Sequence, residues 1–74
     1  MTHILWTKAN CPQCKLTSRQ LDAAGIDYEV RSFDNEPELV EEARAMGFQS
    51  APVVITDDDA WCGFRPDKLA GLTA

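Results

Sequence analysis

The chain has 74 residues, 45% hydrophobic and 26% charged, a balance typical of one small globular domain spanning residues 1–74 rather than of a disordered segment. Its formal net charge of −5 argues against nucleic acids and anionic membranes as partners, because both require a basic surface. No apolar run approaches the roughly 20 residues of a membrane-spanning helix, and the N-terminus lacks the basic start and long apolar stretch of a signal peptide, so we expect a cytoplasmic protein.

The first third of the chain predicts a strand followed by a helix. Residues His3–Thr7 are rich in β-favouring side chains without polar alternation, which indicates a central strand covered on both faces. Pro12 favours the first turn of a helix, where its missing N–H costs nothing. Small or apolar residues then recur on one side of that helix: Cys14, Thr17, Ser18, Leu21, Ala24 and Gly25.

The rest of the chain completes an order of βαβαββα. Residues 27–32 alternate with period two and predict a strand, so the first two strands should be parallel. Asp34 or Asn35 is expected to cap a second helix. Its buried stripe is predicted to comprise Leu39, Val40, Ala43 and Met46. Residues 52–56 and Ala60–Cys62 predict a hairpin, and Pro66 opens a last helix ending near Leu72.

Two of the three cysteines, Cys11 and Cys14, open the first predicted helix. Their spacing brings the Cβ atoms to about 5–6 Å, from which a modest adjustment reaches disulfide geometry. In the cytoplasm such a pair is typical of a metal site or a catalytic dithiol rather than of a permanent crosslink. Amides at a helix start stabilise a thiolate. We therefore expect Cys11, exposed ahead of the helix, to attack substrate disulfides and Cys14, facing the core, to resolve the mixed disulfide.

Zinc binding is the alternative role of this cysteine pair. A structural zinc site needs four ligands, and the candidates are Cys11, Cys14, Cys62 and His3. His3 starts the strand that ends before Cys11, and at about 3.3 Å per residue the two are too far apart for one ion. We therefore expect no metal and no other cofactor, and keep a zinc-binding or structural module as a remote alternative.

Four segments carry a resemblance that spans nearly the whole chain. They are Trp6-Thr7-Lys8 ahead of Cys11-Pro12-Gln13-Cys14, residues 24–29, Ala51-Pro52-Val53, and Trp61-Cys62-Gly63-Phe64-Arg65-Pro66. The last is similar to the W-S-G-F-R-P signature of NrdH-redoxins, glutaredoxin-like members of the thioredoxin superfamily. The resemblance implies a thioredoxin fold, with a four-stranded mixed sheet flanked by three helices. It also implies a dithiol protein that donates electrons to the large subunit of class Ib ribonucleotide reductase and is re-reduced by thioredoxin reductase. We expect it to act as a monomer.

Two residues depart from the NrdH-redoxin pattern. Pro12 after the first cysteine is closer to ordinary glutaredoxins, and Cys62 stands where the signature has serine. A glutathione-dependent glutaredoxin is therefore the alternative function. Against it, glutaredoxins that use glutathione typically carry a Gly-Gly pair followed by an Asp, and the segment around Gly63 has neither.

The resemblance also implies residues that contact partners. It implies a cis peptide bond between Ala51 and Pro52, with the backbone of Ala51 open to an extended substrate segment. Trp61 and Phe64, on either side of Gly63, are expected to form an apolar docking patch, unless Trp61 is a core residue.

Three further side chains have alternative roles. Arg65 is expected either to tether its loop or contact an acidic partner, or to be a solvated surface residue. Lys8 precedes the dithiol and is expected either to favour the Cys11 thiolate by its charge or to lie too far from Cys11 to affect it. Cys62 should return to the dithiol end of the sheet, either as a third redox thiol or as a buried small hydrophobe.

Overall fold

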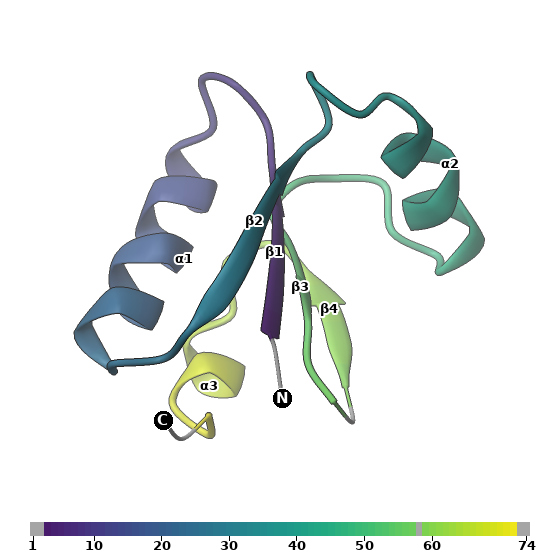
Figure 1. Cartoon of the computed structure of the whole chain (residues 1–74). Coiled ribbons are helices and arrows are strands. Elements are labelled where there is room, and N and C mark those ends of the chain that lie inside the picture. Colours follow the sequence, from purple (N-terminus) through teal and green to yellow (C-terminus); the bar gives the residue numbers. More distant parts are fainter. Residues whose placement is uncertain (1–2, 58, 73–74) are drawn as a thin grey trace.

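A computed structural model describes residues 3–57 and 59–72, and the elements follow the predicted order βαβαββα. Figure 1 shows them as β1 (His3–Thr7), α1 (Pro12–Ala23), β2 (Tyr28–Ser32), α2 (Glu38–Ala45), β3 (Val53–Ile55), β4 (Ala60–Cys62) and α3 (Pro66–Leu69). No helix within these ranges is both long and apolar enough to cross a membrane.

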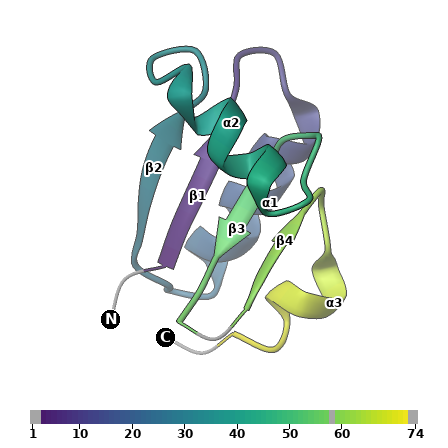
Figure 2. The ribbon, with the colours of Figure 1, turned by 90° about the vertical axis from the view of Figure 1, so that its right-hand side faces the viewer.

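The four strands form one mixed sheet in the order β2-β1-β3-β4 (Figure 2). β1 is parallel to β2 and antiparallel to β3, and β3 is antiparallel to β4. Trp6 near the end of β1 pairs with Val53, which in turn pairs with Cys62. The end of β1, the start of β3 and the end of β4 therefore lie side by side at one end of the sheet.

Helices cover both faces of the sheet, with α1 and α3 on one side and α2 on the other (Figure 1). Adjacent residues of a strand point to opposite faces. Leu5 accordingly packs in a cluster with Leu21 of α1, whereas Trp6 packs with Leu39 of α2. The prediction of a central strand covered on both faces is thus confirmed.

The second helix differs from its prediction in two respects. Pro37 is its N-cap residue and makes no side-chain capping bond, so neither Asp34 nor Asn35 caps it. Val40 and Met46 remain 39% and 40% exposed, because this short helix meets the sheet along the single line of Leu39 and Ala43. The last helix is also shorter than predicted and ends at Leu69 rather than near Leu72.

Candidate dithiol redox site

The two cysteines lie where α1 begins. Cys11 is the N-cap residue, with extended backbone (φ −115°, ψ 98°), and Pro12 is at the start of the helix as predicted. A disulfide joins Cys11 to Cys14, with the Cα atoms 5.2 Å apart. The backbone N–H of Cys14 donates a hydrogen bond to the Cys11 Sγ at 3.1 Å. Such a bond favours a negative charge on that sulfur, so the fold supports Cys11 as a thiolate.

Both cysteines are buried, at 6% exposure for Cys11 and 5% for Cys14. The expectation that Cys11 is exposed was therefore wrong. The physical reason is that its side chain folds back over the first turn of α1 to accept the Cys14 amide, instead of projecting from the helix. A cleft of about 370 Å³ reaches the pair, and Lys8 and Lys15 are among its lining residues.

The loop between β1 and α1 is held in place by the loop after β2. The N–H of Ala9 donates a hydrogen bond to Asp34 Oδ2 at 2.7 Å. Asn10 has φ 56°, in the left-handed region that asparagine tolerates better than most residues. The sequence alone does not reveal this role of Asp34, because an Asp ahead of a helix has the pattern of a capping residue.

Two lysines, Lys8 and Lys15, line the cleft at the start of α1. No acidic side chain occupies its first turn. Lys8 is exposed and lines both the cleft at the cysteines and a larger cleft of about 530 Å³, whose other lining residues include Arg44 and Ala51. Nearby cations favour a thiolate, and the effect of Lys8 on Cys11 stays a prediction.

The Ala51–Pro52 peptide bond is cis, as the resemblance implied. Pro52 is buried. Its carbonyl accepts a hydrogen bond from the N–H of Gly63 at 2.8 Å. The segment ahead of β3 is therefore connected directly to the segment after β4.

A second bond joins the segment after β4 to the dithiol helix. The N–H of Phe64 donates to Gln13 Oε1 at 3.1 Å, across 51 residues of sequence. The sequence alone does not single out Gln13. The only signal was its place between the two cysteines, and nothing in the sequence gives its distant partner.

The two aromatic residues of the expected docking patch are placed differently. Trp61 is only 4% exposed and belongs to the core cluster with Leu5, Leu21 and Val54. Phe64 is half-buried and packs against the same cluster. The prediction of an exposed patch is thus wrong for Trp61. β4 pairs Trp61 with the central Val54, so the indole points into the layer beneath α1 and α3.

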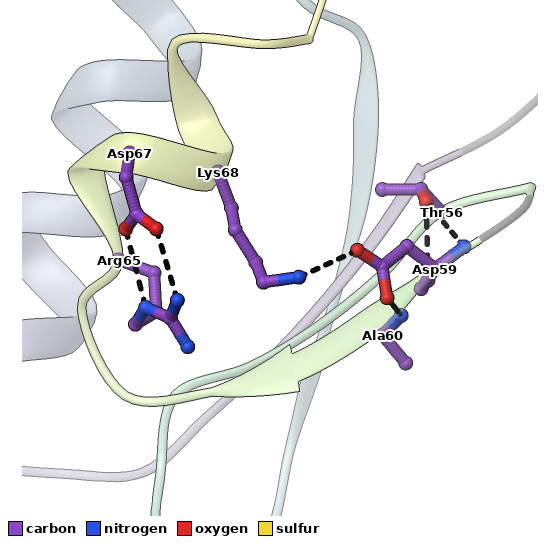
Figure 3. Close-up of polar contacts among 6 residues, drawn as sticks. All are labelled: Thr56, Asp59, Ala60, Arg65, Asp67 and Lys68. Atoms are coloured by element: carbon purple, nitrogen blue, oxygen red, sulfur yellow. Dashed lines mark hydrogen bonds and ion pairs between the residues drawn. The ribbon is translucent and has the colours of Figure 1, made fainter.

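Arg65 is tied to its own chain. Its guanidinium donates two hydrogen bonds to the carboxylate of Asp67, from Nε at 3.1 Å and from a terminal nitrogen at 2.9 Å (Figure 3). This pairing raises the pKa of Arg65 and lowers the pKa of Asp67. The contact supports a tethering role for Arg65, although the side chain stays partly exposed.

Cys62 lies at the dithiol end of the sheet, as expected from the hairpin. It is a free thiol, half-buried, and it packs against the cluster of Trp6, Leu39 and Val53 on the α2 face. This environment favours its interpretation as a small hydrophobe. Among residues 3–57 and 59–72, no group of three or more His, Cys, Asp or Glu side chains is placed to hold a metal ion.

An exchangeable pair of sulfurs at a helix start, on a mixed sheet with helices on both faces, is suited to thiol–disulfide exchange. The fold and this pair define a thiol–disulfide oxidoreductase with a thioredoxin fold. The glutaredoxin family model matches residues 4–61. The glutaredoxin-like protein NrdH of Escherichia coli strain K12 is 43% identical over 68 residues, which cover 92% of this chain and 84% of that protein.

Another relative and two solved structures are also NrdH proteins or glutaredoxins. The glutaredoxin-like protein NrdH of Lactococcus lactis strain IL1403 is also 43% identical, over 92% of this chain and 94% of that protein. The solved NrdH-redoxin of E. coli superimposes with a TM-score of 0.95 at 40% identity, covering 100% of this chain and 97% of that one. A glutaredoxin of Archaeoglobus fulgidus superimposes with a TM-score of 0.83 at 29% identity, covering 95% and 83% of the two chains. The chain belongs to the NrdH family of glutaredoxin-like proteins.

Proposed function

We propose that this protein delivers electrons to the large subunit of class Ib ribonucleotide reductase and is itself re-reduced by NADPH-dependent thioredoxin reductase. The proposal assigns partners to the thiol–disulfide exchange of its family. It is carried by the segment 61–66, which is similar to the NrdH-redoxin signature and is hydrogen-bonded at Phe64 to the dithiol helix. A partner that binds this segment is therefore brought next to the reacting sulfurs.

The reaction proceeds in two exchange steps. The Cys11 thiolate attacks one sulfur of the target disulfide, so a mixed disulfide forms and the other target sulfur leaves as a thiolate that takes up a proton. Cys14 then loses its proton and attacks the Cys11 sulfur, which releases the second target thiol and closes the Cys11–Cys14 disulfide. The target gains two electrons and the protein loses two. NADPH restores them through thioredoxin reductase.

The remaining site residues position the partner. The backbone of Ala51 beside the buried Pro52 lines the larger cleft, where an extended segment of the partner can bind. Gly63, Phe64 and Arg65 supply the neighbouring contact surface. Trp61 supports that surface from beneath, because it is buried.

The cation of Lys8 at both clefts favours the Cys11 thiolate. We further propose that residues 1–74 act as one monomeric domain in the cytoplasm, where thiols are kept reduced. Sedimentation of the reduced protein gives a single species of 8.2 kDa if it is monomeric, and a larger species would contradict that state.

Glutathione is the second candidate reductant, and Pro12 favours it because ordinary glutaredoxins carry proline at this position. The larger cleft also presents Lys8 and Arg44, whose charges are complementary to the carboxylates of a small anionic thiol.

One coupled assay decides between the two reductants. NADPH oxidation is followed on a disulfide substrate, first with thioredoxin reductase and then with glutathione and glutathione reductase. We expect turnover with thioredoxin reductase and only background turnover with glutathione. Activity in the second system alone would overturn the proposal in favour of the glutathione-dependent function. A third measurement, with the large subunit of class Ib ribonucleotide reductase as electron acceptor, tests the target: no reduction of its disulfide would remove that partner.

A further inference from the structure

Two consecutive backbone amides connect the 63–65 loop to two other parts of the site. The N–H of Gly63 donates to the carbonyl of Pro52 at 2.8 Å. The next N–H, that of Phe64, donates to Gln13 Oε1 at 3.1 Å. The first bond is between two backbones, but the second depends on one side chain, which lies between the two cysteines.

The backbone of Gln13 is anchored in α1, while its side chain is exposed. The backbone carbonyl of Gln13 accepts a hydrogen bond at 2.9 Å from the hydroxyl of Thr17, which is fully buried one turn further along α1. A side chain at position 63 would begin 3.7 Å from Gln13 Oε1, so the loop backbone runs at van der Waals distance from the glutamine amide. The side-chain amide of Gln13 therefore extends from an anchored backbone to the N–H of Phe64.

The chemical type of this side chain matters in two ways. A carboxylate at position 13 would accept the same N–H, but it would add a negative charge between the cysteines and oppose the Cys11 thiolate. An apolar side chain would add no charge beside the Cys11 thiolate, but it would leave the N–H of Phe64 without its acceptor. Glutamine is long enough to reach the loop, accepts a hydrogen bond and carries no charge.

We propose that Gln13 is a positioning residue that, through the Phe64 N–H, holds the 63–65 loop against the dithiol in the orientation that protein partners recognise. Gln13 does not exchange disulfides itself. It sets the affinity for large partners and leaves the chemistry of the sulfurs unchanged. The inference rests on the proposed function only in naming thioredoxin reductase as one of these partners.

Three single variants separate positioning from chemistry. Gln13→Met keeps the length of the side chain but removes the acceptor. Gln13→Glu keeps the acceptor and adds the charge. Gln20→Met is the matched control, because Gln20 is an exposed glutamine further along the same helix. Each variant is assayed with thioredoxin reductase, with insulin under dithiothreitol as reductant, and with a small aromatic disulfide. Hydrogen exchange of the Phe64 amide is measured in parallel.

For Gln13→Met we expect KM for insulin and for thioredoxin reductase to rise about fivefold, the size expected for one net hydrogen bond, with kcat and the rate on the small disulfide unchanged. The Phe64 amide should exchange faster. Gln13→Glu should keep the wild-type KM but react more slowly with the small disulfide, and Gln20→Met should match wild type throughout. An unchanged KM in Gln13→Met, or an equal loss on insulin and on the small disulfide, would overturn the inference. If thioredoxin reductase does not reduce even the wild type, the proposed function fails, and the insulin assay still decides the role of Gln13.

Discussion

The ammonium group of Lys68 lies over the indole ring of Trp61, with Nζ 5.5 Å from the ring centroid. Lys68 belongs to α3 and Trp61 to β4, so the contact joins the last helix to the edge of the sheet. Nζ is also 2.8 Å from Asp59 Oδ2, at the turn of the hairpin (Figure 3). The aromatic ring that the sequence signature offers for docking is therefore covered, in part, by an ion pair of the protein itself.

Replacing this cation should destabilise the protein modestly. We expect Lys68→Met to lower the free energy of unfolding by about 0.5–1 kcal/mol, because the variant loses both the cation–π contact with Trp61 and the partly exposed ion pair with Asp59. Urea unfolding followed by tryptophan fluorescence measures the change. Lys15→Met is the control, because Lys15 is an exposed lysine on another helix. Equal loss in both variants would show that the contact with Trp61 adds nothing.

Acid should weaken the contact between the hairpin and α3. The hydrogen bond from Lys68 lowers the pKa of Asp59 below its ordinary value of 3.8. A folded-state pKa below the unfolded one gives stability that is complete above pH 3.8 and is lost as the pH falls through the folded value. Unfolding free energies between pH 7 and pH 2, in the wild type and in Asp59→Asn, measure this contribution. The variant should lose less stability on acidification.

The control for this experiment is Asp27→Asn, which removes the same charge at an exposed site away from the hairpin. Because the ion pair is partly exposed, added salt should reduce the difference between Asp59→Asn and the wild type. If Asp59→Asn and Asp27→Asn follow the same pH profile, the hydrogen bond to Lys68 does not contribute to acid stability.

Replacing either of two glycines should destabilise the protein, because their backbones adopt the left-handed conformation. Gly63 has φ +83° and Gly47 has φ +86°. A Cβ at position 47 would have no atom within 4 Å, and one at position 63 would meet Gln13 Oε1 at 3.7 Å, an ordinary van der Waals contact. We therefore expect Gly63→Ala and Gly47→Ala to cost about 1–2 kcal/mol each, the penalty of a left-handed conformation. Gly71→Ala is the matched control, because that position lacks the left-handed conformation. Urea unfolding compares the three variants. A much larger cost at Gly63 would show that the added methyl group clashes with a neighbouring atom, which would contradict the structure.

Serine substitutions of the three cysteines should have different effects on turnover. Cys14→Ser should retain attack by Cys11 and accumulate a mixed disulfide with the target, while turnover falls to background. Cys62→Ser should retain nearly full turnover, because Cys62 packs against the α2-face cluster and forms no disulfide. Gel shifts under non-reducing conditions detect the adduct. An adduct that persists in Cys11→Ser but disappears in Cys62→Ser would assign the attack to the third thiol.

Thiol counting gives an independent check on Cys62. The oxidised protein should present one thiol that reacts slowly with an aromatic disulfide under native conditions, since this side chain is half-buried. Labelling as fast as that of a free cysteine in solution would contradict its interpretation as a small hydrophobe.

Local patterns were sufficient for the order of elements and for the chemistry. Pro12 after Cys11 predicts the helix start, and the i, i+3 spacing predicts the sulfur pair, because both depend on a few neighbouring residues. The parallel pairing of β1 with β2 follows from the strand–helix–strand order. Patterning was less reliable for α2, where Val40 and Met46 fit the helical period but lie beyond the width of the sheet contact.

By itself, the sequence determined that this protein is a small dithiol redox domain, since periodicity, cysteine spacing and turn residues act over short distances. Only the tertiary structure decided which residues surround the dithiol. It buried Cys11 and Trp61, paired Ala9 with Asp34, and connected Phe64 to Gln13 across 51 residues. Such contacts depend on how the helices pack on the sheet, because each distant segment is compatible with several partners until the whole fold places it beside one.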